Sequence, residues 1–181
     1  MRLDGKTAIV TGAASGFGAG IARKFVAEGA QVMLVDLNHD GAMNMAEELG
    51  DGSFGHAANV ADGVQVAEAV STAREVFGEV DILVNNAGVT HLPAPMEDVS
   101  EEDFDRVFAV NCKSIYHFAR TLIPHMKARG TGAVLNVSST AGLSPRPNLN
   151  WYNSSKGWVN TATKAMAVEL APKGVRVNAI N

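Results

Sequence analysis

Short apolar runs alternate along the chain with stretches of helical periodicity. The runs are rich in β-branched residues and are bounded by glycine or polar residues, which is typical of buried strands. Six runs follow this pattern, and the third is the weakest of them: residues 7–11, 31–36, 53–60, 81–85, 132–138 and 175–181.

Between these runs, apolar residues recur every three or four positions, as on the buried face of a helix. This pattern follows the first strand through Phe25 and then covers residues 40–49, 64–77, 103–126 and 152–170. Ser100 is expected to cap the fourth of these helices, and Pro124 is expected to kink it or to set a new start.

The alternation of strands and helices predicts an α/β fold, with a doubly wound parallel sheet inside three α/β/α layers. Ligands of such folds bind at the carboxyl ends of the strands, near the point where the strand order reverses. The residues that follow each strand are therefore the first candidates for a functional site.

Composition narrows the class of protein. The 181 residues suffice for one domain, and 46% apolar and 19% charged residues are ordinary for a globular chain. A net charge of −4 without a basic block argues against nucleic acid as a partner. No membrane span or signal peptide is apparent, and the single Cys112 excludes an internal disulfide framework. A soluble, cytoplasmic protein is expected.

A glycine-rich turn joins the first strand to the first helix. Glycines let the backbone approach a pyrophosphate, and a helix N-terminus offers unpaired N–H groups. The spacing of Gly12, Gly16 and Gly18 differs from the commonest dinucleotide fingerprint. Such a turn can also be only a tight loop, but its place between strand and helix favours cofactor binding, with Ser15 and Phe17 in the same turn.

Asp36 ends the second strand. A carboxylate at this position accepts hydrogen bonds from the adenosine ribose and repels a 2′-phosphate. Neither Leu37 beside it nor Ser15 in the turn supplies a positive charge to neutralise that phosphate. The sequence therefore predicts NAD rather than NADP.

Tyr152 and Lys156 lie four residues apart in a predicted helix, so they share one face. A free tyrosine titrates at about pH 10, but an ammonium group one turn away favours the phenolate. Tyr152 could then exchange a proton with a substrate oxygen. The same spacing also occurs on ordinary helices, so the pair depends on support from the rest of the chain.

Other chemistry-bearing side chains have simpler interpretations. Asn111 falls on the apolar stripe of its helix and should be buried with hydrogen-bond partners. His117 and His125 lack a third ligand nearby in sequence, so no metal site is expected. Cys112 fits a small buried apolar residue.

Taken in order, several of these motifs resemble the short-chain dehydrogenase/reductase family. The similarity runs from about Lys6 to the last residue, and the joint pattern is highly specific. It implies a Rossmann fold that binds NAD(P) and carries its own active site, expected here as a single domain over residues 1–181. The motifs are Thr11–Gly18, Asn85–Gly88, Asn111, Ser139 and Tyr152–Lys156.

The resemblance also implies catalytic roles. Tyr152 would be the general acid and base. Ser139, thirteen positions before it, would hold the substrate oxygen, in preference to Ser138. Lys156 would support the phenolate and bind the nicotinamide ribose, and Asn111 would hold a water that links Lys156 to solvent.

Further cofactor contacts follow from the same resemblance. Asn86, Ala87 and Gly88 would shape the adenosine side of the pocket and steady the sheet. Asn59 and Val60 would contact the adenine, although the family often has an aspartate where this chain has Asn59. The asparagine keeps an acceptor oxygen, so only the affinity is affected.

The expected function is NAD-dependent interconversion of a secondary alcohol and a ketone by hydride transfer. A non-catalytic NAD-binding sensor or scaffold is the alternative, and a methyl-donor enzyme is a third possibility that has no use for Tyr152 and Lys156. Acyl thioesters, sugars, polyols and cyclic alcohols stay open as substrates. Pocket candidates are residues 90–92 and 143–150, where Arg146 would meet an anionic group or be only a solvated charge.

Two further expectations follow from the family. Its long helices, here residues 103–126 and 152–170, pair with their copies, so a homodimer or homotetramer is expected. Its members also continue with a substrate lid, a helix and a last strand, and these segments are absent from the sequence after Asn181.

Overall fold

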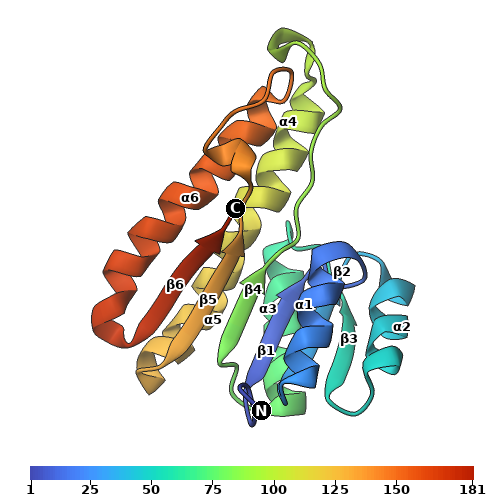
Figure 1. Cartoon of the computed structure of the whole chain (residues 1–181), viewed down its shortest axis with the longest axis vertical. Helices are drawn as coiled ribbons and strands as arrows, with labels where there is room; N and C mark the ends of the chain where they lie inside the picture. Colours follow the sequence, from blue (N-terminus) through green and yellow to red (C-terminus); the bar gives the residue numbers. More distant parts are fainter.

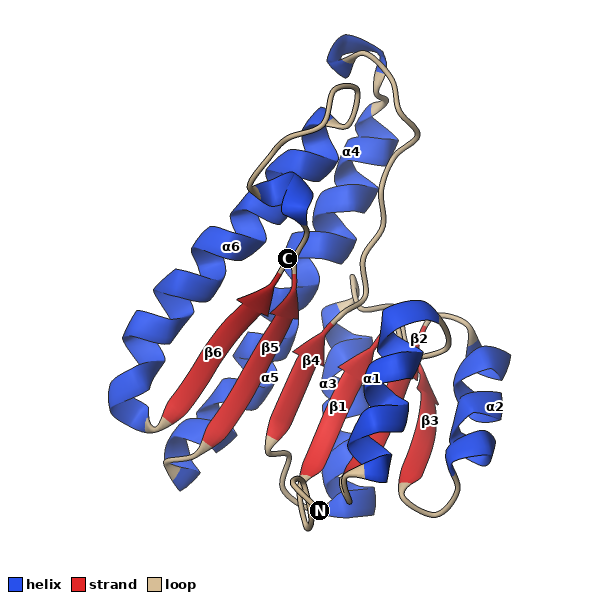
Figure 2. Ribbon diagram, viewed as in Figure 1, coloured by secondary structure: helices blue, strands red, loops and turns tan.

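The computed structural model describes residues 1–181 as one six-stranded sheet with helices on both faces (Figures 1 and 2). The strand order is β3-β2-β1-β4-β5-β6, and every neighbouring pair is parallel. The doubly wound α/β fold is thereby confirmed. The strands are β1 (Thr7–Thr11), β2 (Gln31–Asp36), β3 (Ser53–Ala57), β4 (Ile82–Asn85), β5 (Gly132–Val137) and β6 (Val175–Ile180).

Helices form the two outer layers. In Figure 2, α1 and α2 lie in front of the sheet, and α3 and α5 lie behind it. The six helices are α1 (Gly16–Ala27), α2 (His39–Leu49), α3 (Gly63–Phe77), α4 (Glu101–Phe108), α5 (Ser114–Arg129) and α6 (Asn150–Leu170).

The sheet divides the core into two clusters. In β1, Ile9 belongs to the larger cluster with α3 and α5, whereas Ala8 and Val10 belong to the smaller one with α1 and α2. All three side chains are fully buried, because a parallel strand in the middle of the sheet is covered on both faces. Continuous apolar runs therefore mark the central strands.

The long helix breaks at a different place from the one expected. Ser100 caps α4 as predicted, since its Oγ accepts from the Asp103 N–H at 3.1 Å. A π-helical turn, Ala109–Lys113, then separates α4 from α5. The prediction that Pro124 sets a new start is wrong, because α5 runs through Pro124 to Arg129. Its buried residues, which include Ile123, offset the one lost N–H donor.

Two strand predictions also need correction. The third strand ends at Ala57 rather than at residue 60, so Asn59 and Val60 lie beyond it. The last strand, β6, forms an edge of the sheet and is only half buried. Val175 and Val177 face the core, while Arg176, Asn178 and Ile180 are exposed and Ala179 is half-buried, because only one face of this strand is covered.

Candidate active site

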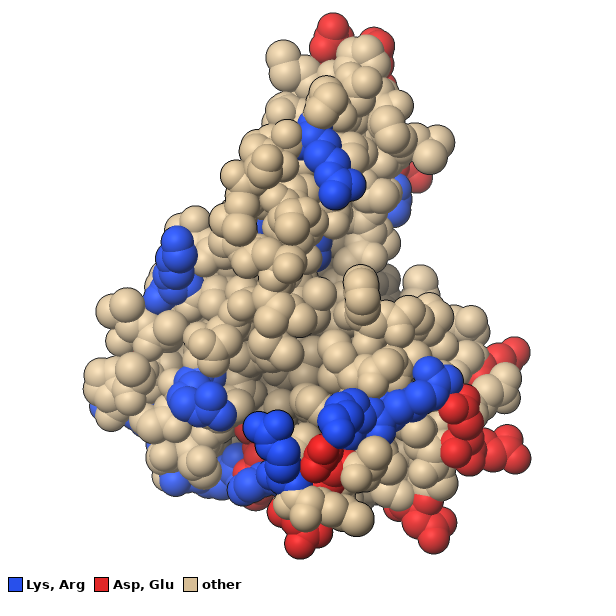
Figure 3. Space-filling view, in the orientation of Figure 1, with Lys and Arg blue, Asp and Glu red and all other residues tan.

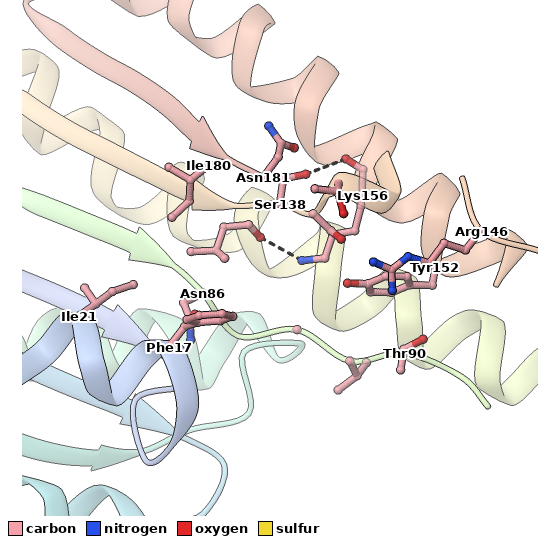
Figure 4. Close-up of a pocket in the computed structure, with 15 residues that line it drawn as sticks. Phe17, Ile21, Asn86, Thr90, Ser138, Arg146, Tyr152, Lys156, Ile180 and Asn181 are labelled. Carbon is pink, nitrogen blue, oxygen red and sulfur yellow. Dashed lines mark hydrogen bonds between the residues drawn. The ribbon is translucent and has the colours of Figure 1, made fainter. Parts of the chain in front are cut away.

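A cavity of about 740 Å³ opens at the carboxyl ends of the central strands, as the fold predicts (Figure 4). Its walls come from the glycine-rich turn, the segments after β4 and β5, the start of α6 and the end of β6. The lining residues are Phe17, Ile21, Asn86, Gly88, Val89, Thr90, Val137, Ser138, Ser139, Thr140, Arg146, Tyr152, Lys156, Ile180 and Asn181.

The glycine-rich turn packs directly against the segment after β4. Gly12 has φ +63°, and a Cβ atom there would lie 3.0 Å from Ala87 Cα and 3.0 Å from Asn86 Nδ2. A Cβ atom on Gly18 would overlap the carbonyl oxygen of Gly12 and lie 2.6 Å from Asn86 Nδ2. Gly16 also has a positive φ, +56°, but has open space around it. Close approach thus explains Gly12 and Gly18, and backbone conformation explains Gly16.

Thr11 and Asn86 join β1 to β4 beneath this turn. Thr11 Oγ1 accepts from the N–H groups of Asn86 and Ala87 at 2.9 and 3.0 Å. Asn86 Nδ2 donates to the carbonyl oxygens of Thr11 and Gly12 at 2.8 and 3.1 Å. The two motifs, 75 residues apart in sequence, form one hydrogen-bonded unit at the reversal of strand order.

The start of α1 differs from the starts of α2, α3 and α4. Asn38, Asp62 and Ser100 accept hydrogen bonds from the first turns of α2, α3 and α4. Ser15 at the start of α1 makes no such bond, and the first turn of α1 contains no acid. The positive end of α1 is therefore free for an anion from outside the chain.

Asp36 lies beside the glycine-rich turn, as predicted. Its Oδ2 accepts from the Ala14 N–H at 2.9 Å, and its Oδ1 accepts from the Asn38 N–H at 2.9 Å. The carboxylate thus fixes the turn against the end of β2 in addition to any ligand that it binds. Leu37 next to it is exposed.

Tyr152 and Lys156 share one face of α6 and both line the cavity. The Lys156 Nζ lies 6.0 Å from the centroid of the Tyr152 ring and donates to the Val137 carbonyl at 3.0 Å (Figure 4). The lysine is buried, and this burial lowers its pKa, with nearby Cys112 acting in the opposite direction. Burial also raises the pKa of the Cys112 thiol to about 12, so that side chain stays neutral.

The two serines after β5 have different surroundings. Ser138 is buried and its Oγ donates to the Lys156 carbonyl at 3.1 Å, which holds α6 against the strand. Ser139 Oγ accepts from the Ala141 N–H at 3.1 Å, so its own proton has no partner in the chain. Of the two hydroxyls, that of Ser139 is the one able to donate into the cavity.

Asn111 lies in the π-helical turn, behind the cavity wall. It is buried and partnered, which confirms that expectation. Its Oδ1 accepts from the Val89 N–H at 2.8 Å, and its Nδ2 donates to the Val89 carbonyl and to Ser155 Oγ, both at 2.9 Å. A Cβ atom on Gly88 would lie 3.3 Å from both Asn111 Oδ1 and Lys156 Nζ. The asparagine and the lysine therefore meet at Gly88.

Some predicted contacts lie away from the cavity. Asn59 Oδ1 accepts from the Ala61 N–H at 3.0 Å, and Val60 is buried in the larger core cluster. Of the loop expected to form the pocket, Thr90 lines the cavity, whereas His91 is buried and Leu92 is exposed.

Several lining residues carry no motif in the sequence. They are apolar or small side chains at the end of a strand or helix turn, and only the sheet order brings them to one place: Ile21, Val89, Val137, Thr140, Ile180 and Asn181. Their positions at the ends of predicted strands or just after them, or on the helix that follows the glycine-rich turn, were the available signal.

The protein has neither a cluster of potential metal ligands nor a helix suited to span a membrane. No three or more His, Cys, Asp or Glu side chains come together as potential metal ligands. None of the helices combines the length and the apolar character needed to cross a bilayer.

A doubly wound sheet with an uncapped helix start, a glycine-rich turn and a Tyr-x-x-x-Lys pair in one cavity defines an oxidoreductase of the nicotinamide-dependent class. The chain belongs to the short chain dehydrogenase family, whose model matches residues 6–181. The expected family is thus confirmed, and with it a dehydrogenase or reductase that acts on alcohol and keto groups.

Individual relatives agree with this assignment. A 4-formylbenzenesulfonate dehydrogenase of Comamonas testosteroni is 45% identical over 100% of this chain and 73% of its own length. A D-threitol dehydrogenase of Mycolicibacterium smegmatis is 40% identical over 99% of this chain and 70% of its own. The crystal structure of a 3-ketoacyl-(acyl-carrier-protein) reductase from Brucella melitensis complexed with NADH is 49% identical, with a TM-score of 0.97 over 99% of this chain and 76% of that one.

Proposed function

We propose that the protein interconverts a secondary alcohol and a ketone with NAD as hydride carrier and Tyr152 as the group that transfers the proton. The observation that carries this proposal is that one cavity joins the glycine-rich turn below α1 to Tyr152, Lys156 and Ser139. A binding module without turnover would have no need of a buried lysine beside a tyrosine, because burying that cation costs stability.

The residues present fit a dinucleotide. The uncapped start of α1 suits the pyrophosphate, and Gly12 and Gly18 leave the backbone of the turn accessible. Asp36 at the end of β2 suits the adenosine ribose and disfavours a 2′-phosphate. When bound, the nicotinamide ring supplies the site that accepts or delivers the hydride.

Asp36 gives the test of cofactor choice. NAD is expected to bind more tightly than NADP, and Asp36→Ala should narrow the difference between the two dissociation constants. Tryptophan fluorescence or calorimetric titration measures both constants. Equal affinities of the unmutated protein for NAD and NADP would refute this assignment.

The protein groups then divide the remaining work. Ser139 donates a hydrogen bond to the substrate oxygen, and Tyr152 donates its proton to that oxygen in reduction or removes it in oxidation. Lys156 places its ammonium group 6.0 Å from the centroid of the Tyr152 ring. Asn111 positions the Val89 backbone and Ser155 of α6 around this group. Since oxidation needs the phenolate and reduction needs the phenol, the two directions should show opposite trends with pH.

Tyr152→Phe tests the catalytic assignment. The variant keeps the ring but loses the oxygen, so kcat should fall by about 10²- to 10⁴-fold while NADH affinity stays unchanged. Lys156→Ala should reduce both, because that side chain is also expected to hold the ribose. The protein has two tyrosines, and Tyr116→Phe is the matched control because Tyr116 is half exposed on α5. Full turnover in Tyr152→Phe would show that another group transfers the proton.

We also propose that the protein assembles as a dimer or tetramer through α5 and α6. Large apolar side chains stay exposed on these helices: Trp158 is 41% exposed, Val168 79% and Tyr116 50%. Such side chains are the usual material of an isologous interface. A monomer in light scattering at micromolar concentration would contradict this assignment.

A further inference from the structure

The cavity contains an unmatched positive charge outside the catalytic group. Arg146 and Lys156 are the two cationic residues of its lining, and the lining contains no aspartate or glutamate. Lys156 is buried and donates to the Val137 carbonyl. The Arg146 guanidinium, in contrast, takes part in none of the ion pairs or side-chain hydrogen bonds of the protein.

Four of the seven other arginines are paired with a carboxylate. They are Arg23, Arg74, Arg106 and Arg129. On the face in Figure 3, acidic side chains gather mainly along the lower edge, around α2 and at the upper tip. A chain with a net charge of −4 thus pairs half of its eight arginines with acids, and Arg146, the one arginine that lines the cavity, is not among them.

The backbone around Arg146 is held in place. Pro145 and Pro147 flank it and restrict the chain. The Arg146 carbonyl accepts from Asn153 Nδ2 at 2.8 Å, which ties the loop to the residue next to Tyr152. Asn148, with φ +61°, accepts through its carbonyl from the Ala94 N–H at 3.0 Å. A charge that only interacts with solvent needs no such anchoring to α6.

Arg146 lies on the substrate side of the cavity. In Figure 4 it enters from the same side as Tyr152, whereas Phe17 and Ile21 of the cofactor side lie at the opposite end. The uncapped start of α1 already offers a place for the cofactor phosphates. An anion that meets Arg146 therefore belongs to the second reactant.

We propose that the substrate carries its own oxyanion, a carboxylate or a sulfonate, and that Arg146 binds this group while the reacting oxygen lies at Tyr152 and Ser139. A guanidinium donates two parallel hydrogen bonds to such a planar or tripod anion, and this fixes the distance from the anion to the reacting carbon. Val89, which also lines the cavity, supplies apolar surface for the carbon skeleton. This inference rests on the proposed function, of which it names the substrate class.

Matched pairs of ketones test the proposal on the full chain. 4-Acetylbenzoate is compared with 4-acetylbenzamide, and 4-oxopentanoate with 4-oxopentanamide, with NADH as the reductant. Within each pair the skeleton is the same and only the charge differs. The variants are Arg146→Gln, Arg146→Lys and the control Arg176→Gln, which removes an equal charge from the exposed side of β6.

The expected result is a preference for the anion of at least one pair. Arg146→Gln should lower kcat/KM for that anion by about 10- to 100-fold and leave the amide unchanged. Arg146→Lys should restore part of the loss, and Arg176→Gln should have no effect. Equal use of acid and amide, or an unchanged kcat/KM in Arg146→Gln, would overturn the substrate class but leave the proposed function intact.

A binding measurement distinguishes failure of the proposed function from failure of the proposed substrate class. If the unmutated protein reduces no ketone at all, the proposed function fails. Calorimetric titration of 4-acetylbenzoate into the NADH-loaded protein then decides on Arg146 alone, since the proposal requires binding that Arg146→Gln weakens. Absent or unchanged binding overturns it. Arg146 could instead be needed for turnover of an acyl-coenzyme A, with no preference for the acid over the amide in either small pair. The anion that Arg146 binds would then belong to the carrier and not to the substrate, and the proposal would be overturned.

Discussion

Gly18 and Gly20 offer a pair of identical substitutions with opposite expected outcomes. Both glycines belong to α1 and lie two residues apart. A Cβ atom on Gly18 would overlap the Gly12 carbonyl oxygen and would lie 2.8 Å from its carbon, whereas a Cβ atom on Gly20 would have nothing within 4 Å. The helix backbone is the same in both cases, so the difference isolates the contact between α1 and the glycine-rich turn.

The magnitudes follow from these distances. Non-bonded carbon atoms prefer separations of about 3.5–4.0 Å, so Gly18→Ala must open the junction by about 1 Å. The atoms that would have to move belong to backbone and to Asn86, which joins β1 to β4. We expect a loss of about 3 kcal/mol in the free energy of unfolding. Gly20→Ala should gain up to about 1 kcal/mol, because alanine favours an exposed helix position.

Urea unfolding followed by tryptophan fluorescence measures the free energy of unfolding of both variants. NADH titration without urea, at a temperature where Gly18→Ala is folded, measures the dissociation constant of the cofactor. The affinity of Gly18→Ala should fall about tenfold or more, since the turn that faces the cofactor has moved. Gly20→Ala should bind as the unmutated protein does. A Gly18→Ala variant within about 0.5 kcal/mol of the unmutated protein, with unchanged NADH affinity, would refute the reasoning.

Three further predictions concern the catalytic group. Lys156→Met should raise the free energy of unfolding, relative to the unmutated protein, more at neutral pH than at high pH. Burial lowers the lysine pKa in the folded state, so the unmutated protein gains stability relative to the variant as the pH rises towards about 10.4, and unfolding at several pH values measures this slope. Asn111→Leu should cost about 3 kcal/mol in urea unfolding, because the Val89 N–H and carbonyl lose their partner. Ser139→Ala should lower kcat by about 10²-fold and cost little stability, since it removes only the bond from the Ala141 N–H. Ser138→Ala should lower the melting temperature more, since it removes a buried bond to α6. Equal effects of the two substitutions on kcat and on melting temperature would contradict their assignment.

The parts of the fold that sequence patterns predict are those in which local and tertiary preferences agree. β1 and β2 are covered on both faces, so their apolar runs fix their ends within a residue. The end of β3 was placed three residues too late because Val60 is buried in the core without belonging to the sheet. An apolar residue reports burial, and only the pairing of neighbouring strands reports where a strand ends.

In the site, too, some features follow from local sequence patterns and others depend on tertiary structure. Spacing on one helix was enough to bring Tyr152 and Lys156 together, because four residues complete about one turn. Ile180 reaches the same cavity only through the order of the strands, which no local pattern encodes. The tasks of Ser138 and Ser139 differ through one hydrogen bond to α6, a contact that depends on how that helix crosses the end of β5.

The π-helical turn between α4 and α5 makes the number of residues in this stretch matter as much as their identity. A π turn contains one residue more than an α turn, and each residue of an α-helix rotates the chain by about 100°. Deleting any one residue of the turn would let α4 and α5 fuse into a regular helix whose two ends keep their relative orientation, because the π turn absorbs the extra residue, but the side chains inside the turn would change direction. Asn111 would turn away from Val89 even if it were retained. Length variation in homologous chains should therefore avoid this stretch, and a sequence one residue shorter here would have to hold the cavity wall by other contacts.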